Sequence, residues 1–149
     1  MKRITVHEEW CLGCHLCEYY CAFANSGGDD MADALRGVAI RPRIAVEDAE
    51  NDVHFAVSCR HCATPRCAEG CITGALSVVD GVIRLDADKC VGCYTCILLC
   101  PYGCITPSEG KPIQKCELCL NNSAGAPLCV QKCPNRAIVL EEGAVPCAL

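Results

Sequence analysis

The cysteines constrain this chain more than any other feature of its sequence. Of its 149 residues, 18 are cysteine, whereas aromatic residues make up only 5%. Sixteen of the cysteines fall into four groups of four, and in every group three residues separate the last two cysteines. A small chain of this composition relies on its sulfur atoms for stability that a hydrophobic core supplies elsewhere.

The four groups, which we call motifs one to four, share one pattern. Motifs one and three have the spacing C-x2-C-x2-C-x3-C, and motifs two and four widen the middle gap to four and nine residues. Motif one is Cys11, Cys14, Cys17 and Cys21; motif two is Cys59, Cys62, Cys67 and Cys71; motif three is Cys90, Cys93, Cys96 and Cys100; motif four is Cys116, Cys119, Cys129 and Cys133.

This spacing is typical of ligands to cubane [4Fe-4S] clusters. Three closely spaced cysteines on a loop can hold three corners of a cube. The fourth lies where the chain turns away, and in two-cluster ferredoxins it binds the other cluster. Motifs therefore work in pairs, and four motifs predict four [4Fe-4S] clusters.

Other uses of the thiols explain the spacing less well. A zinc site closes on four ligands and has no use for the third and fourth cysteine of each motif. The C-x-x-C-H sequence of residues 11–15 resembles a haem attachment site, but Cys17 and Cys21 continue the series. Disulfides need an oxidising compartment. We keep a zinc-binding interaction module as the alternative from another functional class.

A predicted hairpin pairs motifs two and three. Residues 75–85 contain two short apolar runs around Asp80-Gly81, a strong signal for a type I′ turn. Motifs two and three together with this hairpin predict an inner unit with one cluster on Cys59, Cys62, Cys67 and Cys100, and another on Cys90, Cys93, Cys96 and Cys71.

The two chain ends supply the corresponding strands for motifs one and four. Residues 137–143 resemble residues 75–81, and residues 4–6 lie as far ahead of motif one as residues 83–85 lie ahead of motif three. We therefore predict an outer unit with one cluster on Cys11, Cys14, Cys17 and Cys133, and the other on Cys116, Cys119, Cys129 and Cys21.

The expected fold is α+β, with two nested bacterial 2[4Fe-4S] ferredoxin-like units of short strands and helices that the clusters nucleate. The outer unit is residues 1–21 plus 108–149, the inner unit is 59–107, and residues 22–58 are an insertion. We expect the insertion to be part loop and part short sheet, formed by 38–46 and 53–57, with a solvated acidic turn over 47–52. Shielding of clusters and docking of a partner are both open as its role.

Several residues beside the motifs have open roles. Cys104 is expected to pack as a small apolar residue and Cys147 to be a thiol without function. His15 and His61 are expected to tune hydrogen bonding and not to bind iron. The basic residues beside ligands either offset cluster charge, raise cluster potentials slightly, meet an acidic partner or are simply solvated; they are Arg60, Arg66, Lys89, Lys115 and Lys132.

Four motifs in this order, with Cys59-Arg60-His61-Cys62 opening the second, resemble four-cluster ferredoxin-like electron-transfer subunits. Such subunits accompany molybdenum and tungsten enzymes such as dimethyl sulfoxide reductase, formate dehydrogenase and aldehyde oxidoreductase, and also hydrogenases and carbon monoxide dehydrogenases. The resemblance covers residues 4–140, although Ala22 and Ile72 replace the proline that follows motifs three and four. It implies a catalytic partner subunit, exchange with soluble ferredoxin, and in some relatives homo-oligomeric filaments.

The remaining sequence features limit the function further. We find no activated nucleophile and no phosphate loop, so we expect a non-catalytic electron carrier, with a freely diffusing polyferredoxin as the alternative. The first residues lack a signal peptide and no apolar run reaches membrane-spanning length, so we expect an anaerobic, cytoplasmic protein without a membrane span. A net charge of −5 argues against nucleic acid as a partner.

Overall fold

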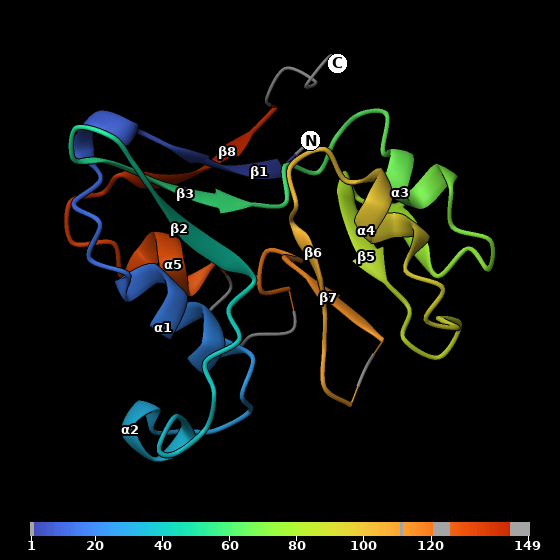
Figure 1. The fold of residues 1–149 in the computed structure, drawn as a ribbon, viewed down its shortest axis with the longest axis horizontal. Coiled ribbons are helices and arrows are strands. Elements are labelled where there is room, and N and C mark those ends of the chain that lie inside the picture. Colours follow the sequence, from blue (N-terminus) through green and yellow to red (C-terminus); the bar gives the residue numbers. More distant parts are fainter. Residues whose placement is uncertain (1, 111, 121–125, 144–149) are drawn as a thin grey trace.

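The chain folds into short helices and two-stranded antiparallel sheets, as the computed structural model shows (Figure 1). The structure describes residues 2–110, 112–120 and 126–143. In chain order the elements are β1 (Lys2–Val6), the 3-10 helix η1 (Glu8–Trp10), α1 (Leu16–Ala24), α2 (Met31–Ala34), β2 (Ile44–Ala49), β3 (Val53–Ser58), α3 (Arg66–Glu69), β4 (Leu76–Val79), β5 (Val82–Leu85), α4 (Thr95–Leu99), β6 (Ile105–Pro107), β7 (Ile113–Lys115), α5 (Leu128–Gln131) and β8 (Ile138–Glu142). The mixed α and β composition expected from the sequence is confirmed.

Two of the sheets are those that the sequence predicted. Strands β4 and β5 form a hairpin whose turn residues, Asp80 and Gly81, both have positive φ, as a type I′ turn requires. Strand β1 pairs with β8 from Lys2↔Glu142 to Val6↔Ile138, so the two chain ends share one sheet. This sheet has the strand arrangement of the β4–β5 hairpin without its connecting turn.

The segment between α1 and motif two differs from the prediction in detail. Strand β2 begins at Ile44 and not at residue 38, because Pro42 cannot donate a ladder hydrogen bond. Residues 47 and 48 belong to β2, so the acidic turn is shorter than predicted and centres on Asn51 and Asp52, both with positive φ. Strands β2 and β3 pair with each other and pack against α1, η1 and β1.

One hairpin was not predicted. Strands β6 and β7 pair from Ile105↔Lys115 to Pro107↔Ile113 and connect α4 to motif four. The predicted boundary between residues 107 and 108 falls in the loop of this hairpin. In Figure 1 the hairpin lies between the part of the fold that contains α1 and α5 and the part that contains α3 and α4.

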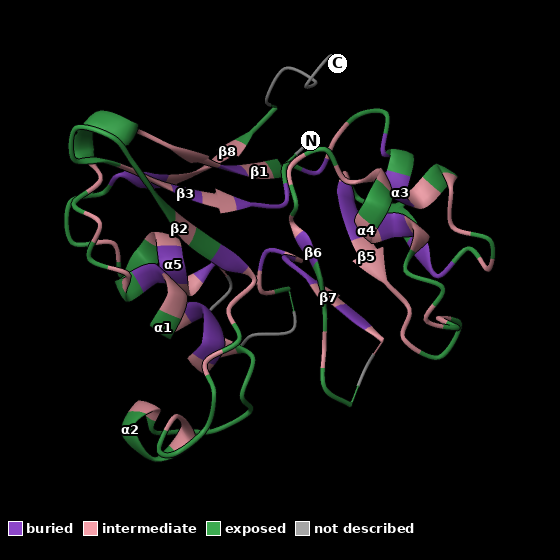
Figure 2. Ribbon diagram, viewed as in Figure 1, coloured by how far each residue is buried: buried purple, intermediate pink, exposed green. Residues whose placement is uncertain are grey.

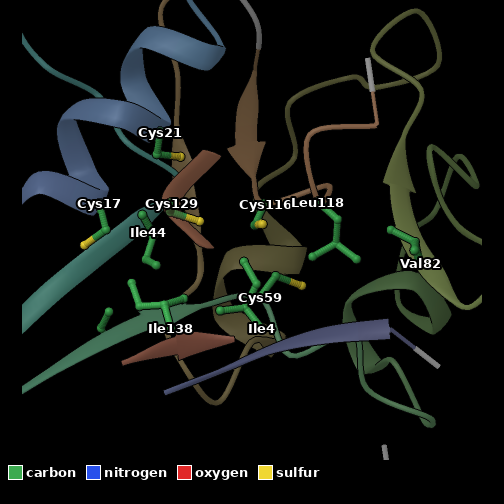
Figure 3. Close-up of a cluster of buried hydrophobic side chains, with 11 residues drawn as sticks. Ile4, Cys17, Cys21, Ile44, Cys59, Val82, Cys116, Leu118, Cys129 and Ile138 are labelled. Atoms are coloured by element: carbon green, nitrogen blue, oxygen red, sulfur yellow. The ribbon is translucent and has the colours of Figure 1, made fainter. Parts of the chain in front are cut away.

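Buried side chains form two hydrophobic clusters, and cysteines belong to both. Figure 2 marks the buried residues along the ribbon. The larger contains Ile4, Ile44 and Ile138 together with five cysteines of three motifs, several of which Figure 3 shows side by side. The smaller contains Leu76, Ile83 and cysteines of motifs two and three. Sulfur atoms thus fill positions that aliphatic groups occupy in most cores. Within the described ranges, no helix has the length and apolar character needed to cross a membrane.

Gly13 lies in motif one, next to His54 of the β2–β3 hairpin, and offers a test of how the hairpin packs on motif one. Its φ is +60°, and an added Cβ would lie 2.7 Å from Cγ of His54 on β3. We expect Gly13→Ala to combine left-handed strain, about 1–2 kcal/mol, with displacement of the His54 ring.

Gly37 provides the control, because its φ is +70° but nothing lies within 4 Å of an added Cβ. Gly37→Ala should therefore lower the thermal unfolding midpoint less than Gly13→Ala does. The midpoint is measured by heating each anaerobic, cluster-loaded variant and following the loss of its visible absorbance. Equal decreases would mean that His54 does not pack on motif one.

Candidate metal centres

Each motif begins with the same tight loop. The residue directly before the second cysteine has positive φ in all four motifs: these residues are Gly13, His61, Gly92 and Leu118, with φ of 60°, 45°, 70° and 57°. The left-handed residue reverses the chain so that the first two cysteines of a motif can face one centre. Glycine adopts this conformation freely, whereas a residue with a Cβ adopts it at a cost that surrounding contacts must offset.

The third cysteine of every motif has a common position as well. It is the second residue of a short helix in each case: Cys17 in α1, Cys67 in α3, Cys96 in α4 and Cys129 in α5. All four of these cysteines are buried. The loop and the helix start therefore bring three thiols of each motif to one side of the chain.

Three thiols of motif two line a cavity of about 230 Å³ whose walls also include residues of α4 and β5. Its walls contain Cys59, Cys62 and Cys67 of motif two and Cys100 of motif three. Cys100 of motif three thus completes a set of four with the three cysteines of motif two.

The same crossing occurs at two narrower cavities of about 20 Å³ each. Three cysteines of motif three lie with Cys71 of motif two around the first. Three cysteines of motif one lie with Cys133 of motif four around the second, which Val46 of β2 also lines. Motif one is therefore covered by the β2–β3 hairpin.

The four remaining thiols of the motifs also lie near one another. Burial raises the pKa of the Cys129 thiol well above its usual range, and the neighbouring Cys116, Cys21 and Cys119 raise it further. Figure 3 shows Cys21, Cys129 and Cys116 in the larger hydrophobic cluster. Here again three cysteines of one motif lie close to the fourth cysteine of another.

The chemistry of these sets fits the expected clusters. A thiolate is the form that binds metal, and hydrogen-bond donors favour that form. The backbone N–H of Arg43 donates to Sγ of Cys21 at 3.2 Å, and the Asn25 amide lies 3.8 Å from the same sulfur. Among the described residues, no three His, Cys, Asp or Glu side chains converge closely enough to hold a single metal ion.

Cys104 lies closer to a candidate centre than the sequence indicated. It is half-buried and packs at the margin of the larger hydrophobic cluster, as expected, but it also lines the 230 Å³ cavity. The Cys104 thiol donates to the backbone carbonyl of Tyr102 at 3.3 Å. The nearness of Cys104, together with backbone N–H groups, lowers the pKa of the Cys100 thiol to about 5 against the effect of burial. The sequence signal for this placement was the position of Cys104 four residues after Cys100. Strand β6 begins at the next residue, and the chain there turns Cys104 back toward motif three. Cys147 lies outside the described residues.

The two histidines have different environments. His15 is partly exposed, and its Nδ1 lies 2.9 Å from a carboxylate oxygen of Glu18. His61 is 1% exposed, and burial, followed by the charge of Lys115, lowers its pKa to about 3. Its Nδ1 accepts a hydrogen bond from the backbone N–H of Ile83 at 3.0 Å. The proton of the neutral ring is therefore on Nε2, which is buried without a hydrogen-bond partner in the described part of the chain.

The basic residues beside the motifs also separate into different environments. Lys89 is exposed and pairs with Asp86 at 2.9 Å. The guanidinium of Arg60 lies 4.4 Å from the ring centroid of Tyr102. Lys115 is 1% exposed, so surface solvation does not describe it.

With the fold and thiol sets described, comparison with known proteins assigns the class. Residues 51–143 match the 4Fe-4S dicluster domain family. This match covers more than half of the chain, so the protein belongs to that family of iron-sulfur proteins.

Individual relatives are similar over nearly the whole chain. HydN, an electron transport protein of Escherichia coli (strain K12), is 30% identical over 156 residues, which cover 93% of this chain and 87% of HydN. AegA of the same organism is 36% identical over 147 residues, 93% of this chain but 22% of AegA. The beta subunit of NADH-dependent phenylglyoxylate dehydrogenase from Aromatoleum evansii is 37% identical over 134 residues, 86% of this chain and 27% of that subunit. The chain therefore spans about a quarter or less of the length of the last two.

We expect the Cys104 thiol to donate a hydrogen bond to Sγ of Cys100 when a cluster is bound, and the potential of that cluster tests this. A donor to a ligand sulfur stabilises the more negative, reduced cluster and so raises its potential. We expect Cys104→Ala to lower the potential of one cluster, while Cys104→Ser, which keeps a donor, leaves it near the wild-type value. A redox titration followed by electron paramagnetic resonance measures this, and equal potentials in both variants would contradict it.

Proposed function

We propose that this protein is a non-catalytic iron-sulfur subunit that relays electrons through four [4Fe-4S] clusters held in two nested ferredoxin-like units. The single observation that supports this most strongly is the crossed lining of the cavities. Each of the three cavities has three cysteines from one motif and the fourth from its partner motif. Crossed ligation of this kind is what a pair of ferredoxin motifs uses.

In this proposal the ligand sets are those expected from the sequence. The sets are Cys71, Cys90, Cys93 and Cys96; Cys59, Cys62, Cys67 and Cys100; Cys21, Cys116, Cys119 and Cys129; and Cys11, Cys14, Cys17 and Cys133. The clusters supply reversible one-electron transfer, and the chain holds, spaces and shields them.

We infer that the sets follow one another in space in that order. Cys59 of the second set and Cys116 of the third belong to the same hydrophobic cluster, as do Cys129 of the third set and Cys17 of the fourth. The pairing of motifs two and three through β4–β5 joins the first set to the second. Electrons can therefore enter at one end of the molecule and leave at the other.

We infer that one end exchanges electrons with a catalytic oxidoreductase subunit and the other with a second redox partner such as soluble ferredoxin. HydN is named as an electron transport protein and another relative as a dehydrogenase subunit, which supports this role. All sixteen thiols of the motifs are used as ligands, so no iron offers an open position to a substrate.

Purification of the native protein without oxygen tests the function. We expect a brown protein with about sixteen irons per chain, four per cubane, that elutes in a complex with a larger oxidoreductase. Elution near 15.9 kDa would favour a free carrier, filaments in electron micrographs would indicate homo-oligomers, and a colourless zinc protein would contradict the proposal.

A pair of double variants tests the crossed ligation. In our proposal Cys21 and Cys119 bind the same cluster, so the variant with Cys21→Ala and Cys119→Ala should lack about four irons. Cys14 and Cys21 bind different clusters, so Cys14→Ala with Cys21→Ala should lack about eight.

Iron analysis and electron paramagnetic resonance measure both losses, and Cys104→Ala is the control that should lose none. If instead each motif bound its own cluster, the two double variants would give the reverse result.

A further inference from the structure

The free edge of β5 carries three buried or half-buried hydrogen bonds that join the two parts of the fold. The edge is free because β4 pairs on the other side of the strand. Ile83 donates its backbone N–H to His61 Nδ1 and accepts a short hydrogen bond on its carbonyl from Nζ of Lys115. Leu85 donates its N–H to the Glu117 carboxylate at 2.7 Å. The side chains come from motif two and from both sides of Cys116 in motif four.

Lys115 is therefore a buried cation at the boundary between the two proposed units. Nζ also donates to the carbonyl of Cys116 at 2.6 Å. No ion pair in the described part of the chain includes Lys115, and the nearby Glu117 pairs with Arg43 instead. Two carbonyl groups compensate only part of the cost of burying an ammonium group, so a compensating negative charge is expected nearby.

The position of Lys115 relative to the thiols indicates where that negative charge lies. One acceptor of Nζ is the carbonyl of Ile83, and Ile83 lines the 230 Å³ cavity together with Cys59 and Cys67. The other acceptor is the carbonyl of Cys116 itself. Cys67 belongs to the second ligand set and Cys116 to the third. An oxidised cubane with four thiolates has a formal charge of about −2, from a core of +2 and four thiolates. Lys115 thus lies between two such charges.

The environment of His61 also indicates that a cluster lies next to this strand edge. It separates Cys59 from Cys62, and the hydrogen bond from Ile83 fixes its proton on Nε2. Nδ1 of His61 also lies 3.8 Å from Sγ of Cys59, a ligand of the second set, so the ring packs directly on that set. Lys115 and His61 are neighbours, since both side chains hydrogen-bond to the backbone of Ile83.

We propose that Lys115, with His61 beside it, raises the reduction potentials of the two central clusters relative to the two terminal ones. Reduction adds a negative charge to a cluster, and a nearby fixed positive charge stabilises the reduced form. The two central clusters are then easier to reduce than the two terminal clusters. Lys115 is a positioning residue for electrons and binds no iron. This inference rests on the proposed function, because it assigns potentials to the clusters proposed above.

Replacement of Lys115 by methionine in the full-length protein loaded with clusters tests the inference. We expect Lys115→Met to lower the ratio of reduced to oxidised form about tenfold for the two central clusters at their wild-type midpoint potentials, which is about 59 mV per electron. The two terminal clusters should keep their potentials. Redox titration followed by electron paramagnetic resonance measures this, with signals assigned through the cysteine variants above.

Lys89 supplies a matched control, because it precedes Cys90 as Lys115 precedes Cys116 but is exposed and paired with Asp86. Lys89→Met should leave all four potentials nearly unchanged. Lys115→Gln, which keeps a donor for the Ile83 carbonyl but removes the charge, should reproduce the shift of Lys115→Met and separates charge from packing.

The outcomes distinguish this inference from the proposed function. A wild-type protein without four clusters contradicts the proposed function. Four clusters whose potentials are unchanged in Lys115→Met and Lys115→Gln contradict only the inference. Failure of both Lys115 variants to assemble clusters that Lys89→Met assembles would assign Lys115 a purely structural role and would also overturn it.

Discussion

The fold depends on bringing closely spaced cysteines around common centres. In each motif a left-handed residue before the second cysteine and a short helix that begins just before the third turn three thiols to one side. Two motifs use glycine at the left-handed position, whereas His61 and Leu118 hold it at a conformational cost. Both of these side chains are buried, and His61 is fixed by its hydrogen bond to β5. Packing therefore maintains the loop where residue type does not.

Exchange of the fourth cysteine explains the long-range organisation. In the ligation that we propose, a motif that completes its neighbour's set must lie next to that neighbour, and the pairing of β1 with β8 brings motifs one and four together in this way. The β2–β3 hairpin then covers motif one, where Val46 reaches the cavity and the N–H of Arg43 reaches Cys21. Of the two roles open for this segment, shielding is the one that these contacts support.

The edge of β5 connects the two parts of the molecule. An unpaired strand edge is usually covered or charged, because its N–H and C=O groups need partners. Here the partners are the side chains His61, Lys115 and Glu117, each next to a cysteine of a motif. The contacts that satisfy the edge therefore also fix how motif two and motif four lie relative to each other.

Sequence alone determined the four motifs, the hairpin at Asp80-Gly81 and the pairing of the chain ends, because ligand spacing and turn chemistry are local properties. It missed the β6–β7 hairpin, whose three-residue strands show no clear alternation, and it overextended β2 beyond Pro42. It also left Lys115 among basic residues of open role, since a lysine beside a ligand is usually solvated. Only the tertiary structure decided that Lys115 is buried, because that depends on which strand edge motif four meets and on what already occupies the other edge.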